Sequence, residues 1–367
     1  MNRRGVIKAG LGPIAAAGAA ALAAPAVAQS RPQIRWRMPT SFPRVLDIPH
    51  RAAELVADAV REASDGAFEI EVFPAGELVP AFEVVDAVGS GSVECCFSSS
   101  IYFWGKEPTF ALGTALPFGL NSRMQNAWMY AGRGIDLMNV FYRRFNLVGI
   151  PGGNTGAQMG GWFRREISSL ADLDGLKMRV AGLGGAVLGK LGVVPQQLSG
   201  GDTYAALERG VIDAAEYVGP YDDEQLGLER VARYYYYPGW WEGGTVLHFF
   251  VNYDQWMSLP PTYQAMFAAA AGEANVVTQA RFDAGNPQAL ARLIARGAEL
   301  RPFGTDILDA AFAATGELVA ELRDQSEDFR TIVDSMLAFR ATEYAWFQVA
   351  EFSYDSYLIA QMRRGAL

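Results

Sequence analysis

The chain repeats one alternation of short strands and helices, and this repetition limits its fold more than any other feature. In the first half, residues 33–38 and 68–73 alternate apolar and polar side chains as strands do. Residues 48–64 between them place apolar side chains at helical spacing. Residues 80–88 have helical composition, and a third strand is expected at 93–97. This rhythm favours an α/β fold with a mainly parallel sheet covered by helices.

The same rhythm returns after a glycine cluster at residues 151–156, where we expect the chain to cross to a second lobe. Strands are predicted at 176–180, 193–197 and 212–218, with helices at 184–192 and 203–210. Gly243 and Gly244 suggest the return crossing. The chain is also longer than one core usually holds. We therefore predict a first lobe at 31–152, completed by part of 245–326, and a second lobe at 153–244.

The C-terminal part of the chain has a different character. No proline follows Pro302, and residues 327–363 predict one very long helix with a heavy aromatic load within the terminal segment 327–367. A helix that is apolar on several faces is buried either in its own protein or in a partner. Its length favours a helix that leaves its own subunit.

The first residues resemble an export signal. Arg3 and Arg4 precede an Ala/Gly-rich apolar run that ends in a small-x-small cleavage pattern at 26–28. We therefore expect residues 1–28 to be a twin-arginine signal peptide and the mature protein to be periplasmic. Removing these residues would change the net charge from −9 to −12, because they carry Arg3, Arg4 and Lys8 and no acid. So acidic a chain repels nucleic acid and anionic membranes.

Cysteine and histidine are too few for a typical zinc site, since only Cys95, Cys96, His50 and His248 occur. A disulfide between neighbouring cysteines would be strained and would close no loop. We therefore interpret both cysteines as small buried strand residues.

Any anion site in an acidic protein must be built locally, from an arginine, backbone N–H groups or a cation. Arg179 lies at the end of a predicted strand, and its planar guanidinium suits a carboxylate. Glu216 ends another strand, and Glu242 closes the aromatic run 234–241. With an amide oxygen such as that of Gln158, the two acids would form an all-oxygen cation site. The plainer interpretations are a surface or interdomain salt bridge for Arg179 and core packing for the aromatic run.

The two acids also allow an enzyme, as a general acid and base. The segment 182–187 resembles a dinucleotide-binding fingerprint, with Asp202 about twenty residues on, although Val187 stands at the third glycine position. An exported NAD(P)-dependent oxidoreductase is therefore the alternative. The chain has no serine-hydrolase elbow, zinc-protease motif or P-loop. A third hypothesis is an adaptor protein that acts through its aromatic C-terminal helix.

Several long segments resemble one known family, the substrate-binding proteins of TRAP transporters. The match is closest to the branch that binds α-keto acids such as pyruvate, and it extends over nearly the whole chain after residue 30. The segments that carry it are 73–78, 104–110, 152–163, 175–180, 213–223 and 234–244. The resemblance implies a receptor and not an enzyme, with the two-lobe, type II-like fold of periplasmic solute-binding proteins, a hinge and a long C-terminal helix.

The same resemblance implies how the site works. Arg179 would pair with the ligand carboxylate, and a sodium or calcium ion would bridge ligand and protein. The implied metal ligands are Gln158, Glu216, the backbone carbonyl of Tyr217 and Glu242, and the implied substrate-binding residues are Arg179, Gln158, Glu216, Tyr102 and Phe42. Tyr217 stands where the keto-acid binder has tryptophan, so pyruvate, a longer 2-oxo acid and lactate all remain open. The expected partners are membrane permease subunits and a second copy that exchanges the C-terminal helix.

Overall fold

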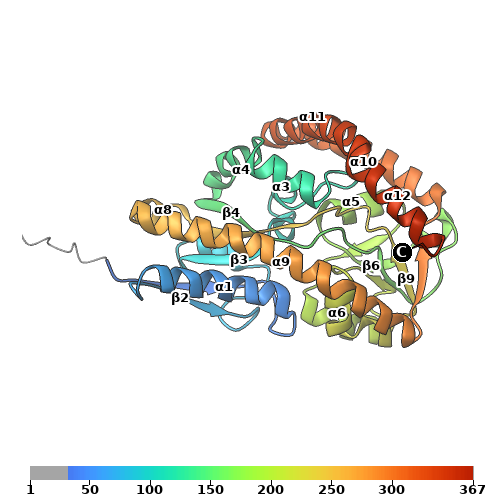
Figure 1. Ribbon diagram of the computed structural model, residues 1–367, viewed down its shortest axis with the longest axis horizontal. Coiled ribbons are helices and arrows are strands. Elements are labelled where there is room, and N and C mark those ends of the chain that lie inside the picture. The colour runs from blue at the N-terminus through green and yellow to red at the C-terminus, as the bar shows by residue number, and fades with distance from the viewer. Residues whose placement is uncertain (1–31, 367) are drawn as a thin grey trace, which may run out of the picture. The chain divides into compact units, whose positions relative to one another are not determined.

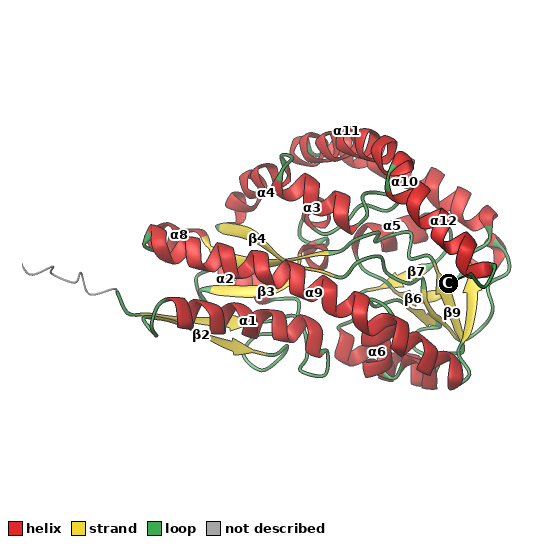
Figure 2. Ribbon diagram, viewed as in Figure 1, coloured by secondary structure: helices red, strands yellow, loops and turns green. Residues whose placement is uncertain are grey.

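Two sheets organise the residues that the computed structural model describes, 32–366 (Figures 1 and 2). The predicted signal peptide at 1–28 lies outside the described residues. In the first sheet β1 pairs with β2 in parallel, and a parallel bridge between Thr40 and Phe97 joins this pair to β3. β10 lies antiparallel between β3 and β4. The strands are β1 Ile34–Pro39, β2 Phe68–Phe73, β3 Cys95–Ser99, β4 Leu147–Asn154 and β10 Val246–Asn252.

The second sheet has the strand order β11-β9-β5-β8-β6-β7. Its strands are β5 Gly161–Phe163, β6 Lys177–Arg179, β7 Val194–Gln196, β8 Ala214–Ala215, β9 Tyr234–Tyr237 and β11 Glu299–Pro302. β6 is parallel to β7 and β8, and β11 is parallel to β9. β5 is antiparallel to both of its neighbours.

The expectation of mainly parallel sheets is therefore wrong for the strands next to the crossings. β5 follows the crossing out of the first sheet, and β10 follows the crossing back. A strand that arrives from the other sheet does not pass through a covering helix, so it is free to enter antiparallel to its neighbours. Both crossing strands do so.

Helices cover the sheets as the apolar spacing predicts, with local differences at their ends. The predicted helix at 80–88 begins only at Val84, and the predicted strand at 212–218 shortens to Ala214–Ala215. The helices are α1 Asp47–Ala63, α2 Val84–Gly89, α3 Ser122–Tyr130, α4 Gly134–Tyr142, α5 Gly182–Lys190, α6 Gly200–Glu208, α7 Pro220–Leu226, α8 Tyr253–Ser258, α9 Pro261–Ala295, α10 Thr305–Gln325, α11 Glu327–Val349 and α12 Glu351–Arg363. Short 3₁₀ helices lie at Ser100–Phe103, Pro108–Gly113, Arg143–Phe145, Leu170–Leu173 and Leu228–Arg230.

One helix, α9, connects the surroundings of both sheets. It packs against α1 and β4 and also against α7, and Figure 1 shows it running past both regions. It continues through Pro287, although proline in a helix interior removes one backbone hydrogen bond. Within 32–366 no helix has the length and apolar composition of a membrane span.

The C-terminal segment is helical, but the prediction of a single uninterrupted helix is wrong. α11 ends at Val349, and α12 begins at Glu351 after Ala350 leaves helical geometry, with φ −88° and ψ −95°. Neither proline nor glycine marks the break in the sequence. α12 has no buried residue, and Phe352, Tyr354 and Tyr357 each expose about two thirds of their surface.

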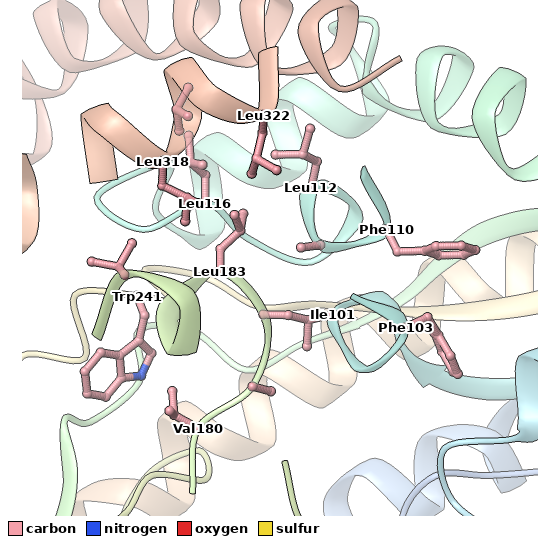
Figure 3. Close-up of a cluster of buried hydrophobic side chains, with 14 of the residues drawn as sticks. Ile101, Phe103, Phe110, Leu112, Leu116, Val180, Leu183, Trp241, Leu318 and Leu322 are labelled. Carbon is pink, nitrogen blue, oxygen red and sulfur yellow. The ribbon is translucent and has the colours of Figure 1, made fainter. Parts of the chain in front are cut away.

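The largest core cluster joins segments from both sheets with α10. Figure 3 shows Ile101, which follows β3, near Leu183, which follows β6, and Leu318 of α10 belongs to the same cluster. Cys95 and Cys96 are buried free thiols in β3, which confirms their interpretation as strand residues.

His248 provides a test of this packing. The ring is buried on β10 and stacks on Phe250, and burial lowers the pKa of His248 to about 3. In the unfolded chain this pKa is near 6.5. Below that pH the unfolded chain binds a proton that the folded chain does not, so stability falls as pH drops from about 6.5 towards 3.

Between pH 7 and pH 4, we expect the unfolding free energy of the wild type to fall by about 3 kcal/mol more than that of His248→Gln. The measurement is urea unfolding of both proteins at the two pH values. Equal losses would mean that His248 is not held neutral by burial.

Candidate functional site

A small cavity gathers all seven residues that the sequence analysis assigned to the site. Side chains or backbone of both sheets contribute, and the cavity's free volume is about 30 Å³. That volume is room for roughly two or three water molecules. Its lining includes Phe42, Tyr102, Gln158, Arg179, Glu216, Tyr217 and Glu242, and also Ser99, Thr155, Asp222, Thr245 and Phe282.

Arg179 stands at the carboxyl end of β6, and its side chain is almost completely buried. Its Nε donates to the carbonyl of Leu198 at 3.2 Å, and Nη1 donates to both the carbonyl and the side-chain Oε1 of Glu216. The guanidinium carbon lies 4.9 Å from the centre of the Tyr217 ring. Lys177, two residues earlier, is exposed, so the buried position belongs to the arginine alone.

Glu216 follows β8 directly and is as buried as its partner Arg179. Burial raises the pKa of Glu216 to about 8, the nearby charge of Arg179 lowers it, and the like charge of Glu242 raises it. Arg179 therefore forms an ion pair, but a buried one between neighbouring strands of the second sheet and not the surface or interdomain salt bridge of the plainer interpretation. It does not compete with a ligand role, because the pair lines the cavity.

Glu242 and Gln158 are joined through Thr245. The Thr245 hydroxyl donates to Glu242 Oε2 and accepts from Gln158 Nε2 at 2.8 Å. The backbones are joined as well, since Gln158 N donates to the Glu242 carbonyl at 3.2 Å. Gln158 Oε1 is left buried without a partner. Burial raises the pKa of Glu242.

Aromatic rings close one side of the cavity. Phe42 packs against Tyr102 with ring centres 6.4 Å apart, and Gln197 donates to the Tyr102 carbonyl at 2.8 Å. The hydroxyl of Tyr217 is buried, and the side chain of Tyr102 is its polar neighbour. Gly200 backs the Tyr217 ring so closely that an added Cβ would lie 2.7 Å from the hydroxyl oxygen.

The aromatic run 234–241 is core and not a cavity wall. Tyr235 stacks on Trp162 and donates to Asp223 at 2.7 Å, and Trp241 belongs to the largest core cluster. The run itself does not line the cavity, and only Glu242, the residue that follows the run, does so. Core packing, the plainer interpretation, is confirmed.

The glycines that resemble a dinucleotide fingerprint serve close packing. An added Cβ on Gly182 would lie 2.1 Å from Ile101 Cγ1, and one on Gly184 would lie 2.7 Å from Trp241 Cβ. Gly182 also has φ +57°, a left-handed conformation that favours glycine. These glycines let α5 approach segments beside the other sheet.

Asp222 is the functional candidate that sequence reasoning missed. It lines the cavity from α7 and is fully buried, and both of its carboxyl oxygens lack a partner. Its neighbour Asp223 is structural, because it accepts from Trp162 Nε1 at 3.0 Å and from Tyr235. The sequence shows only two adjacent aspartates and does not indicate which of them is structural. Among residues 32–366 no three His, Cys, Asp or Glu side chains form a metal cluster, so a cation here would need amide or carbonyl oxygens as well.

Comparison with known proteins identifies the fold and its family. The model of the DctP family, bacterial extracellular solute-binding protein family 7, matches residues 43–325. The chain belongs to this family. Its members are solute-binding receptors and not enzymes, and nothing in the comparisons supports the oxidoreductase alternative.

Three similar proteins add detail. A monocarboxylate 2-oxoacid-binding periplasmic protein of Nostoc is 48% identical over 326 residues, which are 89% of each chain. A TRAP transporter solute-binding protein from Bordetella bronchiseptica, 47% identical with a TM-score of 0.90, covers 91% of this chain and 100% of its own. That structure is a mixed-occupancy dimer with calcium and picolinate in one active site and an apo second site.

A TRAP solute-binding protein from Pseudoalteromonas atlantica holds sodium and pyruvate. It is 35% identical, has a TM-score of 0.86, and covers 88% of this chain and 99% of its own. The two-lobe solute-binding fold that the sequence analysis predicted is thereby confirmed for this DctP protein.

The close approach at Gly182 can be tested by stability. We expect Gly182→Ala to lower the unfolding free energy by about 2–4 kcal/mol, because the new methyl group overlaps Ile101 and the backbone conformation becomes strained. Gly189→Ala is the matched control, since Gly189 lies on the same helix and its added Cβ would meet Pro195 only at 4.0 Å. That change should be neutral or stabilising by up to about 1 kcal/mol. Equal effects in urea unfolding would contradict the packing role.

Proposed function

We propose that this DctP protein is the periplasmic receptor of a TRAP transporter and binds a small 2-oxo or 2-hydroxy monocarboxylate, such as pyruvate or lactate. Arg179 and a bridging sodium or calcium ion would hold the ligand's carboxylate. One observation carries the proposal: a buried arginine, two buried carboxyl groups and an unpartnered amide oxygen line the same small cavity. The ligands of the relatives from Nostoc and Pseudoalteromonas are of this class.

The residues fit a hard cation. Gln158 directs its amide nitrogen to Thr245 and leaves Oε1 unpartnered, so that oxygen is available as a ligand. With the carboxylates of Glu216 and Glu242 and the backbone carbonyl of residue 217, the donor set is all oxygen, as sodium and calcium prefer. The bound cation would supply positive charge to the ligand's oxygens.

Charge balance also supports a cation. The two carboxylates, Arg179 and a bound monocarboxylate together carry a charge of −2 when ionised. A calcium ion would bring the buried sum to zero and a sodium ion to −1, and either relieves the cost of burying like charges. Burial, and to a smaller extent the like charge of Glu242, raises the pKa of Glu216 to about 8, which shows that its ionised form is disfavoured in this cavity.

Cation and carboxylate binding should be coupled through Arg179. Its guanidinium is paired with Glu216. A cation that takes over Glu216 would leave the guanidinium fork available to a carboxylate, for which its two parallel N–H donors are suited. By linkage, each ligand would then raise the affinity for the other.

The cavity volume limits the ligand's size. Room for two or three water molecules corresponds to roughly 60–90 Å³ of molecular volume. That range suits an acid of three or four carbon atoms, and a longer 2-oxo acid would require the cavity to open.

The proposal also covers export, delivery of the ligand and assembly. Export by the twin-arginine signal at 1–28 and delivery to membrane permease subunits belong to this proposal. We also propose a homodimer through the C-terminal helices, and exposed aromatic side chains on α12 support it. The lobe boundaries 31–152 and 153–244 remain part of the proposal.

Arg179→Lys tests the anchor while keeping a positive charge beside Glu216. We expect it to weaken pyruvate binding by about 50-fold or more in the presence of calcium, because lysine lacks the bidentate fork. Isothermal titration calorimetry measures the affinity. Lys177→Ala, on the same strand but exposed, is the matched control and should bind as the wild type does. Normal binding by Arg179→Lys would remove Arg179 from the site.

Removing the cation should remove most carboxylate binding. We expect the rise in Tm that pyruvate causes to disappear after chelation and dialysis, and to return with calcium or sodium. Glu242→Gln should show a weakened response to the added cation, because an amide replaces one charged ligand. A ligand response that is independent of both cations would contradict the bridging role.

The dimer can be tested by deleting residues 351–367. α12 buries no residue in this subunit, so the shortened chain should keep its fold. We expect sedimentation velocity to show a dimer for the full mature chain and a monomer for the deletion. A monomeric full-length protein would contradict the proposed dimer.

A further inference from the structure

The ligand cavity contains a second polar region that the carboxylate anchor and the cation site do not use. Its main element is Asp222, in the first turn of α7. The side chain is fully buried, and neither of its oxygens has a hydrogen-bond partner. The hydroxyl of Tyr217 also lies in the cavity lining, where the side chain of Tyr102 is its polar neighbour.

Within residues 32–366 no basic residue pairs with Asp222. The charge of Arg281 lowers the pKa of Asp222, but the Arg281 guanidinium donates its hydrogen bond to Asp47, at 2.6 Å. Burial raises the pKa of Asp222 well above its usual range, and the neighbouring acids Asp223 and Asp47 raise it further. Burial thus favours the protonated form, and a protonated carboxyl group can donate one hydrogen bond and accept another.

Asp222 lies apart from the anchor. The groups that act on Arg179 are Glu216, Tyr102, Tyr217 and Glu242, whereas those that act on Asp222 are Asp223, Asp47 and Arg281. Tyr217 is influenced by both Arg179 and Asp222, and its ring stacks under the guanidinium. Tyr217 is therefore a neighbour of both the anchor and Asp222.

A purely structural role does not account for Asp222. Its neighbour Asp223 accepts hydrogen bonds from Trp162, Tyr235 and the backbone of Val218. Asp222 makes none of this kind. A buried polar group without a partner is costly, so its partner must come from something that enters the cavity.

We propose that Asp222 and the Tyr217 hydroxyl form a second polar subsite, so that the preferred ligand is a three- or four-carbon 2-oxo or 2-hydroxy acid with a further hydroxyl group at the end remote from its carboxylate. This inference rests on the proposed function. The extra oxygen fits the cavity, because about 60–90 Å³ accommodates a three-carbon acid with one more hydroxyl group. A site built to hydrogen-bond a ligand hydroxyl discriminates strongly against the analogue without it.

The test compares pyruvate with 3-hydroxypyruvate, which differs by one hydroxyl group, by calorimetry on the mature protein with calcium. We expect the wild type to bind 3-hydroxypyruvate at least about tenfold more tightly. Asp222→Leu should reduce this ratio to below about threefold by weakening 3-hydroxypyruvate and leaving pyruvate nearly unchanged. Asp222→Asn, which still donates and accepts, should keep most of the preference. Tyr217→Phe should lose part of it.

Three outcomes would overturn the inference. Equal affinities in the wild type would mean that an ordered water satisfies Asp222, and a preference unchanged by Asp222→Leu or Tyr217→Phe would place recognition elsewhere. The wild-type ratio and the Asp222→Asn variant decide the question even where Asp222→Leu does not fold. If the wild type binds neither acid with calcium or sodium, the proposed function itself fails, which is distinct from binding both acids without preference.

Discussion

The buried contact between Arg179 and Glu216 is the interaction on which the rest of the site depends. It joins the ends of β6 and β8, two neighbouring strands of the second sheet, and it takes two charges out of water. Such a pair returns little net stability, because desolvation offsets most of the attraction. We propose that its value is functional, because it holds an arginine and a carboxyl group at the cavity, where each could exchange its partner for a ligand.

The cavity itself depends on backbone approach more than on side-chain filling. Gly182 brings α5 against Ile101, Gly200 backs the Tyr217 ring, and the segments of Gln158 and Glu242 are joined by a backbone hydrogen bond. These contacts place groups from widely separated parts of the sequence within one small volume. They also explain why glycines that resemble a phosphate-binding fingerprint are required here for packing.

Prediction from sequence was most successful where the pattern is local. The first three strands, the helix near residues 48–64 and the unit around Arg179 lie close to the expected residues. It failed at the strands that follow the crossings, whose antiparallel pairing depends on where the chain returns. It also missed the break at Ala350, which no residue type marks, and the 35-residue helix α9 through Pro287.

The candidate site, too, was predicted only in part from the sequence. The sequence by itself determined the residue types, since an acidic chain needs an arginine and local oxygen ligands to hold a small anion, and its resemblance to a family indicated their positions. Only the tertiary structure decided that these residues share one cavity, that Asp223 is structural, and that Asp222 is left without a partner. The physical reason is that burial and hydrogen-bond satisfaction depend on neighbours distant in the chain, which local residue patterns do not specify.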